Sequence, residues 1–239
     1  MPRAIGFSTG SLAHGNYSAA LETLRCTTAT AVELSALREP ELAPLMRDLK
    51  TLDVAKFGHV SIHAPSALHK YDEADVVRLL SPALEAGYMI VVHADVITRH
   101  REWRRLGRQL CIENMDKRKR TGRTASELRD LFDSLRQARL CLDLAHARQV
   151  DPSLSETIAI LSEFGSRIGQ MHVSELNAES RHGSLSYGAV AAIQSIVGFL
   201  PTAVPAILEY HAEPTEINAH LELAVKVLGG GPKAVRAVG

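Results

Sequence analysis

The sequence predicts an α/β protein, a single closed (β/α)8 barrel, and two observations support this fold class. Eight short apolar runs typical of buried strands alternate with segments of helical periodicity along the 239 residues. The connections are long enough to hold helices, so consecutive strands are expected to pair in parallel, and the chain length matches the roughly 250 residues of such a barrel. No linker divides the chain, so residues 1–239 are expected to form one domain with a loose C-terminal tail over 229–239.

The expected strands are short apolar runs bounded by polar residues or turn signals. In chain order they cover residues 3–9, 31–35, 59–65, 88–95, 109–116, 140–146, 169–175 and 205–210. The sixth run illustrates the pattern, because the apolar residues 140–142 are followed directly by Asp143. A continuous apolar stretch of this length is consistent with a strand buried on both faces.

Helical signals fill most of the connections. Residues 72–86 place apolar side chains at helical spacing and end near Gly87, and glycine is favoured just beyond a helix C-terminus. The next connection, 96–108, gives the weakest helical signal because it is short and dense in arginine. Its Trp103 is expected to pack this short helix onto the barrel.

Two further helices carry N-terminal signals. Thr124 and Glu127 have the spacing of a capping box, in which each side chain accepts a hydrogen bond from the other residue's backbone N–H. Asp151 followed by Pro152 predicts an N-cap with proline at the first helical position.

Composition excludes several classes of protein. The 27 basic and 27 acidic side chains balance, so no strong overall field attracts nucleic acid or an anionic membrane. No apolar run approaches the roughly 20 residues of a membrane span, and the first residues lack the pattern of a signal peptide. The three cysteines form no CxxC pair, which favours reduced thiols and a cytoplasmic location.

Six of the eight expected strands carry a possible metal ligand at or near the C-terminal end. These residues are His63, His93, Glu113, Asp143, His172 and Glu209. A closed barrel directs such side chains toward one axial volume, where crowded carboxylates repel one another unless a cation or shared protons offset their charge. Mixed imidazole and carboxylate ligands suit zinc, manganese or iron better than calcium. The pattern therefore predicts a divalent-metal site, with a hydrogen-bonded polar cluster as the alternative.

Asp143 and His146 lie three residues apart where the sixth apolar run ends. A buried, unpaired carboxylate is costly, so Asp143 is expected to pair or to bind a metal. His146 is expected to face the same cavity, as a second ligand, a substrate contact or a residue that orients another by a hydrogen bond.

The strand ends resemble those of the xylose isomerase-like TIM-barrel superfamily, which contains sugar-phosphate isomerases and epimerases together with AP endonucleases of the endonuclease IV type (AP endonuclease family 2). The similar motifs are SIHAP, VVHAD, CIENMD, LDLAHA, HVSE, SRH and ILEY, and they extend from about Ala4 to Tyr210. The resemblance implies a (β/α)8 barrel that binds one to three divalent ions, with zinc or manganese expected.

The resemblance also implies roles for individual residues. Four residues match the ligands of the single metal in epimerase-like members, namely Glu113, Asp143, His172 and Glu209. In those relatives the two glutamates also exchange protons with the substrate carbon. His63 and His93 match positions that, in endonuclease IV, bind a second zinc bridged to the first by the residue matching Glu113.

His146 and His182 match ligands of a third zinc in endonuclease IV. There an Asp-Arg-His motif supplies the other ligands, whereas this chain reads Ser180-Arg181-His182. A serine hydroxyl is a poor substitute for a carboxylate, so a third ion is not required by the resemblance. The Gly-x-Gly that usually follows reads Ser186-Tyr187-Gly188, a second departure.

Isomerisation or epimerisation of a sugar or sugar phosphate is the first choice of reaction. A metal then polarises the substrate oxygens while carboxylates move the proton beside the carbonyl, and Glu113 and Glu209 are the expected proton carriers. The alternatives are an endonuclease IV-like metal-dependent phosphoesterase and a metal-binding accessory barrel without catalysis. A true xylose isomerase is not expected, because no lysine lies in a strand run.

Substrate contacts are expected around the same mouth. Lys117 and Arg118 open the basic loop 117–123, which could bind a substrate phosphate; a solvated surface turn is the alternative. Arg181 and Glu33, placed at the end of the second strand, are further candidates. A small sugar or sugar phosphate is the expected partner, since no long inserted loops offer an extended face to nucleic acid. A homodimer is possible by analogy with relatives.

Overall fold

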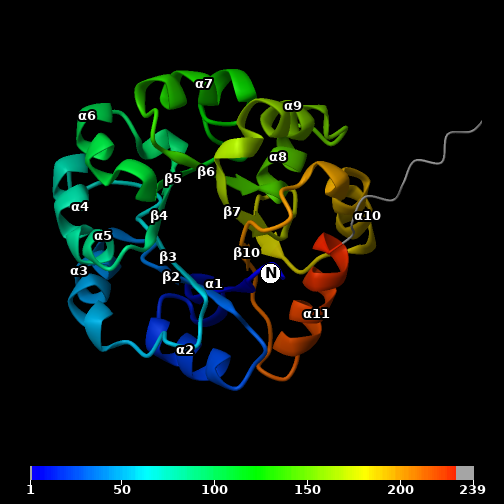
Figure 1. Cartoon of the computed structure of the whole chain (residues 1–239), viewed down its shortest axis with the longest axis horizontal. Coiled ribbons are helices and arrows are strands. Elements are labelled where there is room, and N and C mark those ends of the chain that lie inside the picture. The colour runs from blue at the N-terminus through cyan, green and yellow to red at the C-terminus, as the bar shows by residue number, and fades with distance from the viewer. Residues whose placement is uncertain (1, 230–239) are drawn as a thin grey trace, which may run out of the picture.

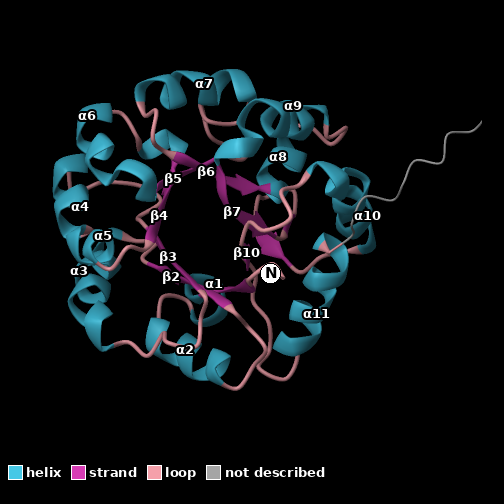
Figure 2. Ribbon diagram, viewed as in Figure 1, coloured by secondary structure: helices cyan, strands magenta, loops and turns pink. Residues whose placement is uncertain are grey.

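The computed structural model describes residues 2–229, and the barrel predicted from the sequence is confirmed. Eight parallel strands close in the order β1-β10-β7-β6-β5-β4-β3-β2 (Figures 1 and 2). Their bounds are β1 Ile5–Ser8, β2 Ala31–Ser35, β3 His59–His63, β4 Met89–His93, β5 Leu110–Glu113, β6 Arg139–Asp143, β7 Ile168–Val173 and β10 Ala206–Leu208. Each coincides with or overlaps a predicted run. Most of the expected tail, 230–239, lies outside the described residues.

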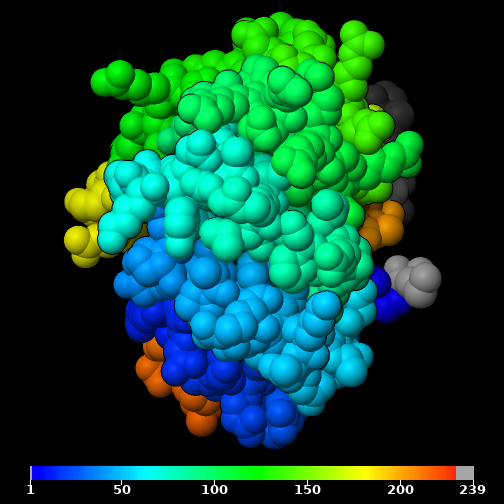
Figure 3. All heavy atoms as spheres, turned by 90° about the vertical axis from the view of Figure 1, so that its left-hand side faces the viewer, coloured from blue at the N-terminus to red at the C-terminus, as the bar shows by residue number. Residues whose placement is uncertain are grey.

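Helices surround the barrel as an outer ring (Figure 2). They are α1 Thr9–Ala13, α2 Tyr17–Arg25, α3 Glu39–Asp48, α4 Glu73–Leu79, α5 Ser81–Glu85, α6 His100–Trp103, α7 Ala125–Ser134, α8 Leu144–Val150, α9 Ser155–Phe164, α10 Tyr187–Ile196 and α11 Ile217–Leu228. In the side view the colours of the flank run from blue to green in chain order, as expected when each strand–helix unit packs against the next (Figure 3). None of the helices over 2–229 has the length and apolar character needed to cross a bilayer.

Two predicted helix boundaries need correction. The helix expected over 72–86 is divided into α4 and α5. Pro82 lies in the first turn of α5. A proline there interrupts the preceding helix because it has no N–H to donate and its ring clashes with the carbonyl group four residues earlier. Gly87 does adopt the expected left-handed backbone, with φ of 77°. The weak signal over 96–108 yields only the short α6 and a 3-10 helix, Arg104–Gln109.

The other N-terminal signals are confirmed in part. Thr124 caps α7 by accepting the N–H of Glu127, but the Glu127 carboxylate accepts the N–H of Arg123 instead of completing the box. The prediction that Asp151 begins a helix is wrong, because α9 starts at Ser155. The Asp151 side chain instead accepts backbone N–H groups in the turn that leads into α9.

The apolar core lies between the strands and the helices, and the barrel interior is partly polar. Trp103 is fully buried, as expected for a residue packing α6 on the barrel, and its indole N–H donates to Glu73. Inside the barrel, Cys111 and Cys141 pack with Val91. Above this small apolar group, the strands end in titratable side chains.

A two-stranded hairpin absent from the sequence prediction follows β7. It pairs β8 (Glu175–Leu176) with β9 (His182–Gly183) in antiparallel fashion. Ser180 lies in its turn with a φ of 55°. The hairpin carries the Ser-Arg-His motif back toward the mouth of the barrel.

Candidate metal centre

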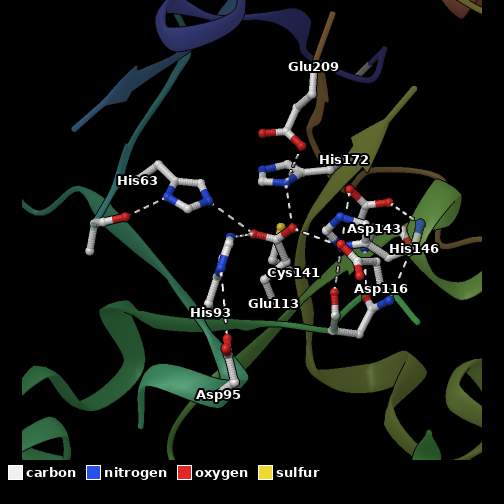
Figure 4. A network of polar contacts seen from close by, with 12 residues as sticks. His63, His93, Asp95, Glu113, Asp116, Cys141, Asp143, His146, His172 and Glu209 are labelled. Carbon is white, nitrogen blue, oxygen red and sulfur yellow. Dashed lines mark hydrogen bonds and ion pairs between the residues drawn. The ribbon is translucent and has the colours of Figure 1, made fainter. Parts of the chain in front are cut away.

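Strand register brings the predicted ligands to one level at the C-terminal end of the barrel. His93 on β4 is paired in register with Glu113 on β5, and Asp143 on β6 with His172 on β7. The residue after β10, Glu209, donates its N–H to Val173 at the end of β7. Five separate segments are therefore aligned by sheet hydrogen bonds, and their side chains converge (Figure 4).

Glu113 lies at the middle of the cluster, with 1% of its surface exposed. One carboxylate oxygen, Oε2, lies 3.0 Å from His63 Nε2 and 3.6 Å from His93 Nε2. The other, Oε1, lies 3.3 Å from His146 Nδ1 and 3.5 Å from His172 Nδ1. Figure 4 shows Glu113 between the two groups of side chains, so one carboxylate can serve both.

The first candidate ligand group consists of Glu113, Asp143, His172 and Glu209. One ligand atom from each lies within 4.8 Å of the others. Asp143 Oδ2 and His172 Nδ1 are buried and have no hydrogen-bond partner among the described residues, although His172 Nδ1 lies only 3.1 Å from Glu209 Oε2. Buried polar atoms are nearly always satisfied, so these orphaned atoms fit a cation, and their donor types fit zinc or manganese.

The second candidate ligand group is His63, His93 and Glu113, again with ligand atoms within 4.8 Å. His63 Nδ1 donates a 2.7 Å hydrogen bond to the Ala64 carbonyl oxygen. In a neutral imidazole this leaves Nε2, the atom facing Glu113, free to bind a metal. Asp95 lies beyond His93, with Oδ1 3.9 Å from Nδ1 and Oδ2 bonded to Lys119 Nζ at 2.7 Å.

His146 and His182 belong to neither group. His146 occupies the first turn of α8, where its N–H donates to Asp143 Oδ1 and its Nδ1 donates to the Asn114 carbonyl oxygen. His182 Nδ1 lies 2.8 Å from Ser174 Oγ, and the two imidazole rings are 5.5 Å apart. Within residues 2–229, no group of three ligand atoms includes either histidine.

Ser180 does not take the place of the missing aspartate. Its hydroxyl donates to Gln149 Oε1 at 2.8 Å. The orienting hydrogen bond considered for His146 is therefore present, and Ser180, at the position that matches the aspartate of the motif, is engaged with Gln149.

Histidine protons balance the carboxylates of this cluster. Burial lowers the pKa of His63, but the hydrogen bond to Glu113 and the charge of Glu33 outweigh it and raise that pKa to about 9. Burial likewise lowers the pKa of His146, and the charges of Asp143 and Glu113 raise it to about 10. Because a metal binds deprotonated imidazole, a proton and a metal would compete for Nε2 of His63.

The pKa values of three other groups in the cluster are also shifted, two downward and one upward. Burial is the main cause that lowers the pKa of His93 to about 3, in spite of the charge of Glu113. For Asp143, burial is the largest influence and raises the pKa. Burial would also raise the pKa of Glu113, but the positive charge of His172, together with hydrogen bonds from His146 and His172, holds it well below its usual value.

Two of the expected substrate contacts are placed differently from the prediction. Glu33 lies in the middle of β2, fully buried inside the barrel, so its expected position at the strand end is wrong. Arg118 is exposed but already forms an ion pair with Asp116 and donates to the Glu179 carbonyl oxygen. Lys117 and Arg181 are exposed near it.

Sequence reasoning missed two residues that support the centre. Asn114 accepts the N–H of Asp143 and donates to its carbonyl oxygen, so it ties the end of β5 to the end of β6 beside two of the candidate ligands. Asp116 is buried and holds Arg118. In the sequence, the only feature that could have indicated Asn114 and Asp116 is that they follow Glu113 at the end of the fifth predicted strand.

No protein-family model and no curated protein sequence matches this chain. Solved structures with the same fold do match. Endonuclease IV from Thermus thermophilus superposes with a TM-score of 0.61 at 20% identity, covering 95% of this chain and 99% of that chain. The 3-keto-D-glucoside 4-epimerase of E. coli gives a TM-score of 0.61 at 11% identity, covering 95% and 100%.

A third match is the probable 3-DHS dehydratase AsbF of Bacillus anthracis, with a TM-score of 0.62, 12% identity and coverage of 95% and 98%. The fold expected from the resemblance is thereby confirmed: this chain shares its barrel with these three proteins. At these identities the similarity defines the fold, and fold alone does not fix the reaction.

Proposed function

We propose that this protein is a divalent-metal-dependent enzyme that isomerises or epimerises a small sugar or sugar phosphate. The proposal rests chiefly on the buried group of Glu113, Asp143, His172 and Glu209, in which two ligand atoms lack any hydrogen-bond partner among the described residues. The fold shared with a sugar epimerase supports this choice. Zinc or manganese is the expected ion.

The two glutamates are the proposed proton carriers. Burial would raise the pKa of Glu209, but the charge of His172 outweighs it and lowers that pKa to about 2, so Glu209 is ionised at neutral pH in the metal-free protein. Glu113 comes from a different strand and could serve a second position on the substrate. When bound, the metal would supply polarisation of the substrate oxygens beside a carbonyl.

The rim of the mouth offers cations for a substrate phosphate. Arg118 Nη1 donates to the carbonyl oxygen of Glu179, which places the loop of Lys117 and Arg118 beside the turn that carries Arg181. Lys117 has no ion pair within residues 2–229, in contrast to Arg118. We therefore propose Lys117 and Arg181 as the more available phosphate contacts, with Arg118 held by Asp116.

Exchange of a carbon-bound hydrogen of the substrate for solvent deuterium tests the proposal. Protein loaded with Mn²⁺ or Zn²⁺ would be incubated in D2O with a panel of ketoses and ketose phosphates, and deuterium beside the carbonyl measured by NMR. Glu209→Gln is expected to reduce incorporation by about 10²–10⁴-fold, the usual contribution of a general acid–base group. Glu213→Gln, which changes an exposed carboxylate nearby, is the matched control. Absence of exchange across the panel would contradict the proposal.

The second candidate function is metal-dependent phosphoester hydrolysis. It is favoured by His63 and His93, which share Glu113 with the first group and could hold a second ion, since paired ions suit phosphoester cleavage. Elemental analysis and cleavage of a duplex containing an abasic site would test it. At least two metals per chain with cleavage that His93→Asn abolishes would favour the hydrolase, whereas bound metal with neither activity would favour an accessory barrel.

A further inference from the structure

A buried carboxylate that the proposed proton transfers do not use lies beneath the centre. Glu33 has no exposed surface. Its Oε2 accepts hydrogen bonds from Gln170 Nε2 at 2.6 Å and Ser61 Oγ at 3.1 Å, and it lies 3.2 Å from His172 Nε2. Within residues 2–229 His172 is its only ion-pair partner. Burying such a group is unfavourable unless its charge and hydrogen bonds are compensated, so its contacts need an explanation.

The two nitrogens of His172 face different environments. Nδ1 points to Glu113 and Glu209, whereas Nε2 points down the barrel to Glu33. A neutral imidazole carries one proton, so a metal on Nδ1 requires the proton on Nε2. The nearest other group, Gln170 Nε2 at 3.0 Å, is itself a donor and cannot accept that proton.

We propose that Glu33 is a positioning residue. Its carboxylate accepts a hydrogen bond from the Nε2–H of His172 and thereby presents Nδ1 to the metal. The inference rests on the proposed metal-dependent function. Histidines that bind metals commonly donate their other ring N–H to a carboxylate, which fixes both the tautomer and the ring orientation. Glu33 is the group placed to do so for His172.

Gln170 fixes the orientation of Glu33 in turn. Its Oε1 lies 2.7 Å from His59 Nε2, so the amide oxygen faces an imidazole and the amide nitrogen must face the carboxylate. His59 begins β3 and borders a cavity of about 930 Å³ at the N-terminal end of the barrel. A column of His59, Gln170, Glu33 and His172 therefore connects that end to the metal centre along the barrel interior.

Metal titration of the full-length protein tests this role. Glu33→Gln keeps the side-chain shape but removes the charged acceptor, and Mn²⁺ affinity, followed by EPR of free Mn²⁺, is expected to fall about 10–100-fold, as for other outer carboxylate partners. The matched control is Glu39→Gln, which alters another buried glutamate whose partners are backbone N–H groups of residues 69–71. Its Mn²⁺ affinity should equal that of the wild type.

A second measurement does not depend on the variant folding. In zinc-loaded wild-type protein, ¹⁵N NMR of the histidine side chains, assigned by through-bond correlation to the backbone, should show His172 bound through Nδ1 and protonated at Nε2. Zinc on Nε2, a proton on Nδ1 or direct zinc ligation by Glu33 would overturn the inference, as would equal Mn²⁺ affinity in Glu33→Gln. Those outcomes leave the metal-dependent function intact, whereas a wild-type protein that binds no divalent metal would overturn both.

Discussion

At the scale of single residues, Asp143 serves the fold and the candidate site together. Its Oδ1 accepts the N–H of His146 and so caps α8, while Oδ2 is buried without a hydrogen-bond partner in the described part of the chain. The two oxygens thus have separable roles, because capping requires an acceptor whereas metal binding requires the negative charge.

Asp143→Asn should separate these roles. Asparagine is as good an N-cap as aspartate, so the free energy of unfolding of the metal-free protein should change by less than about 1 kcal/mol, while metal affinity falls by at least about tenfold. Thermal denaturation and Mn²⁺ titration measure the two effects. Asp151→Asn, which alters a turn carboxylate outside the cluster, should leave affinity unchanged; a similar loss in both variants would argue against Asp143 as a ligand.

At the scale of elements, Glu73 fastens the connection after β4 to α4. Its carboxylate accepts the N–H groups of Thr98 and Arg99 and the indole N–H of Trp103. Burial would raise the pKa of Glu73, but these hydrogen bonds outweigh it and lower that pKa. One carboxylate of α4 thereby holds the short helix α6 and the residues that precede it.

The lowered pKa makes this contribution dependent on pH. The stabilisation should be complete above the unfolded-state value of about 4.3 and lost as pH falls through the lower folded-state pKa. Glu73→Gln should reduce the free energy of unfolding by about 1–3 kcal/mol at pH 7, and the difference from wild type should shrink below about pH 4.3. Urea denaturation across pH measures it; a difference that is constant or grows toward acid would contradict the assignment.

The elements also show what sequence could and could not predict. The strands were predictable because each is an apolar run that stops at a polar residue, and the convergence of the strand-end side chains followed from barrel geometry. The α4–α5 break at Pro82 and the start of α9 at Ser155 depend on local backbone geometry that the apolar pattern does not reveal. The position of Glu33 inside the barrel, below the strand ends, depends on the stagger between neighbouring strands. The sequence of a single strand does not reveal this stagger.

At the scale of the whole molecule, barrel closure is what assembles the centre. Glu113 and Glu209 are separated by nearly a hundred positions in the chain, yet both lie in one buried group. Residues from four strand ends are close together only in the folded barrel. An ion that they bind would therefore bind the folded chain and not the unfolded chain, and would stabilise the fold by mass action.

Metal should therefore raise the melting temperature of the wild-type protein. At an ion concentration one hundred times Kd the gain is about 2.7 kcal/mol, and EDTA should reverse it. Glu113→Gln should abolish most of the shift because Glu113 belongs to both candidate ligand groups described above; of the three buried clusters with metal-ligand spacing, only that of Glu33, His63 and Glu209 lacks it. Glu127→Gln, which alters a half-buried carboxylate of α7 outside both groups, should retain it. Differential scanning calorimetry measures the shift, and an equal gain in both variants would place the ion elsewhere.

The most direct test is anomalous diffraction from crystals of the protein grown with Zn²⁺ or Mn²⁺. We expect an ion at about 2.0–2.2 Å from oxygens of Glu113, Asp143 and Glu209, and from His172 Nδ1. An empty cluster at saturating metal, or an ion bound only at surface residues, would contradict the assignment of this barrel mouth as a metal centre.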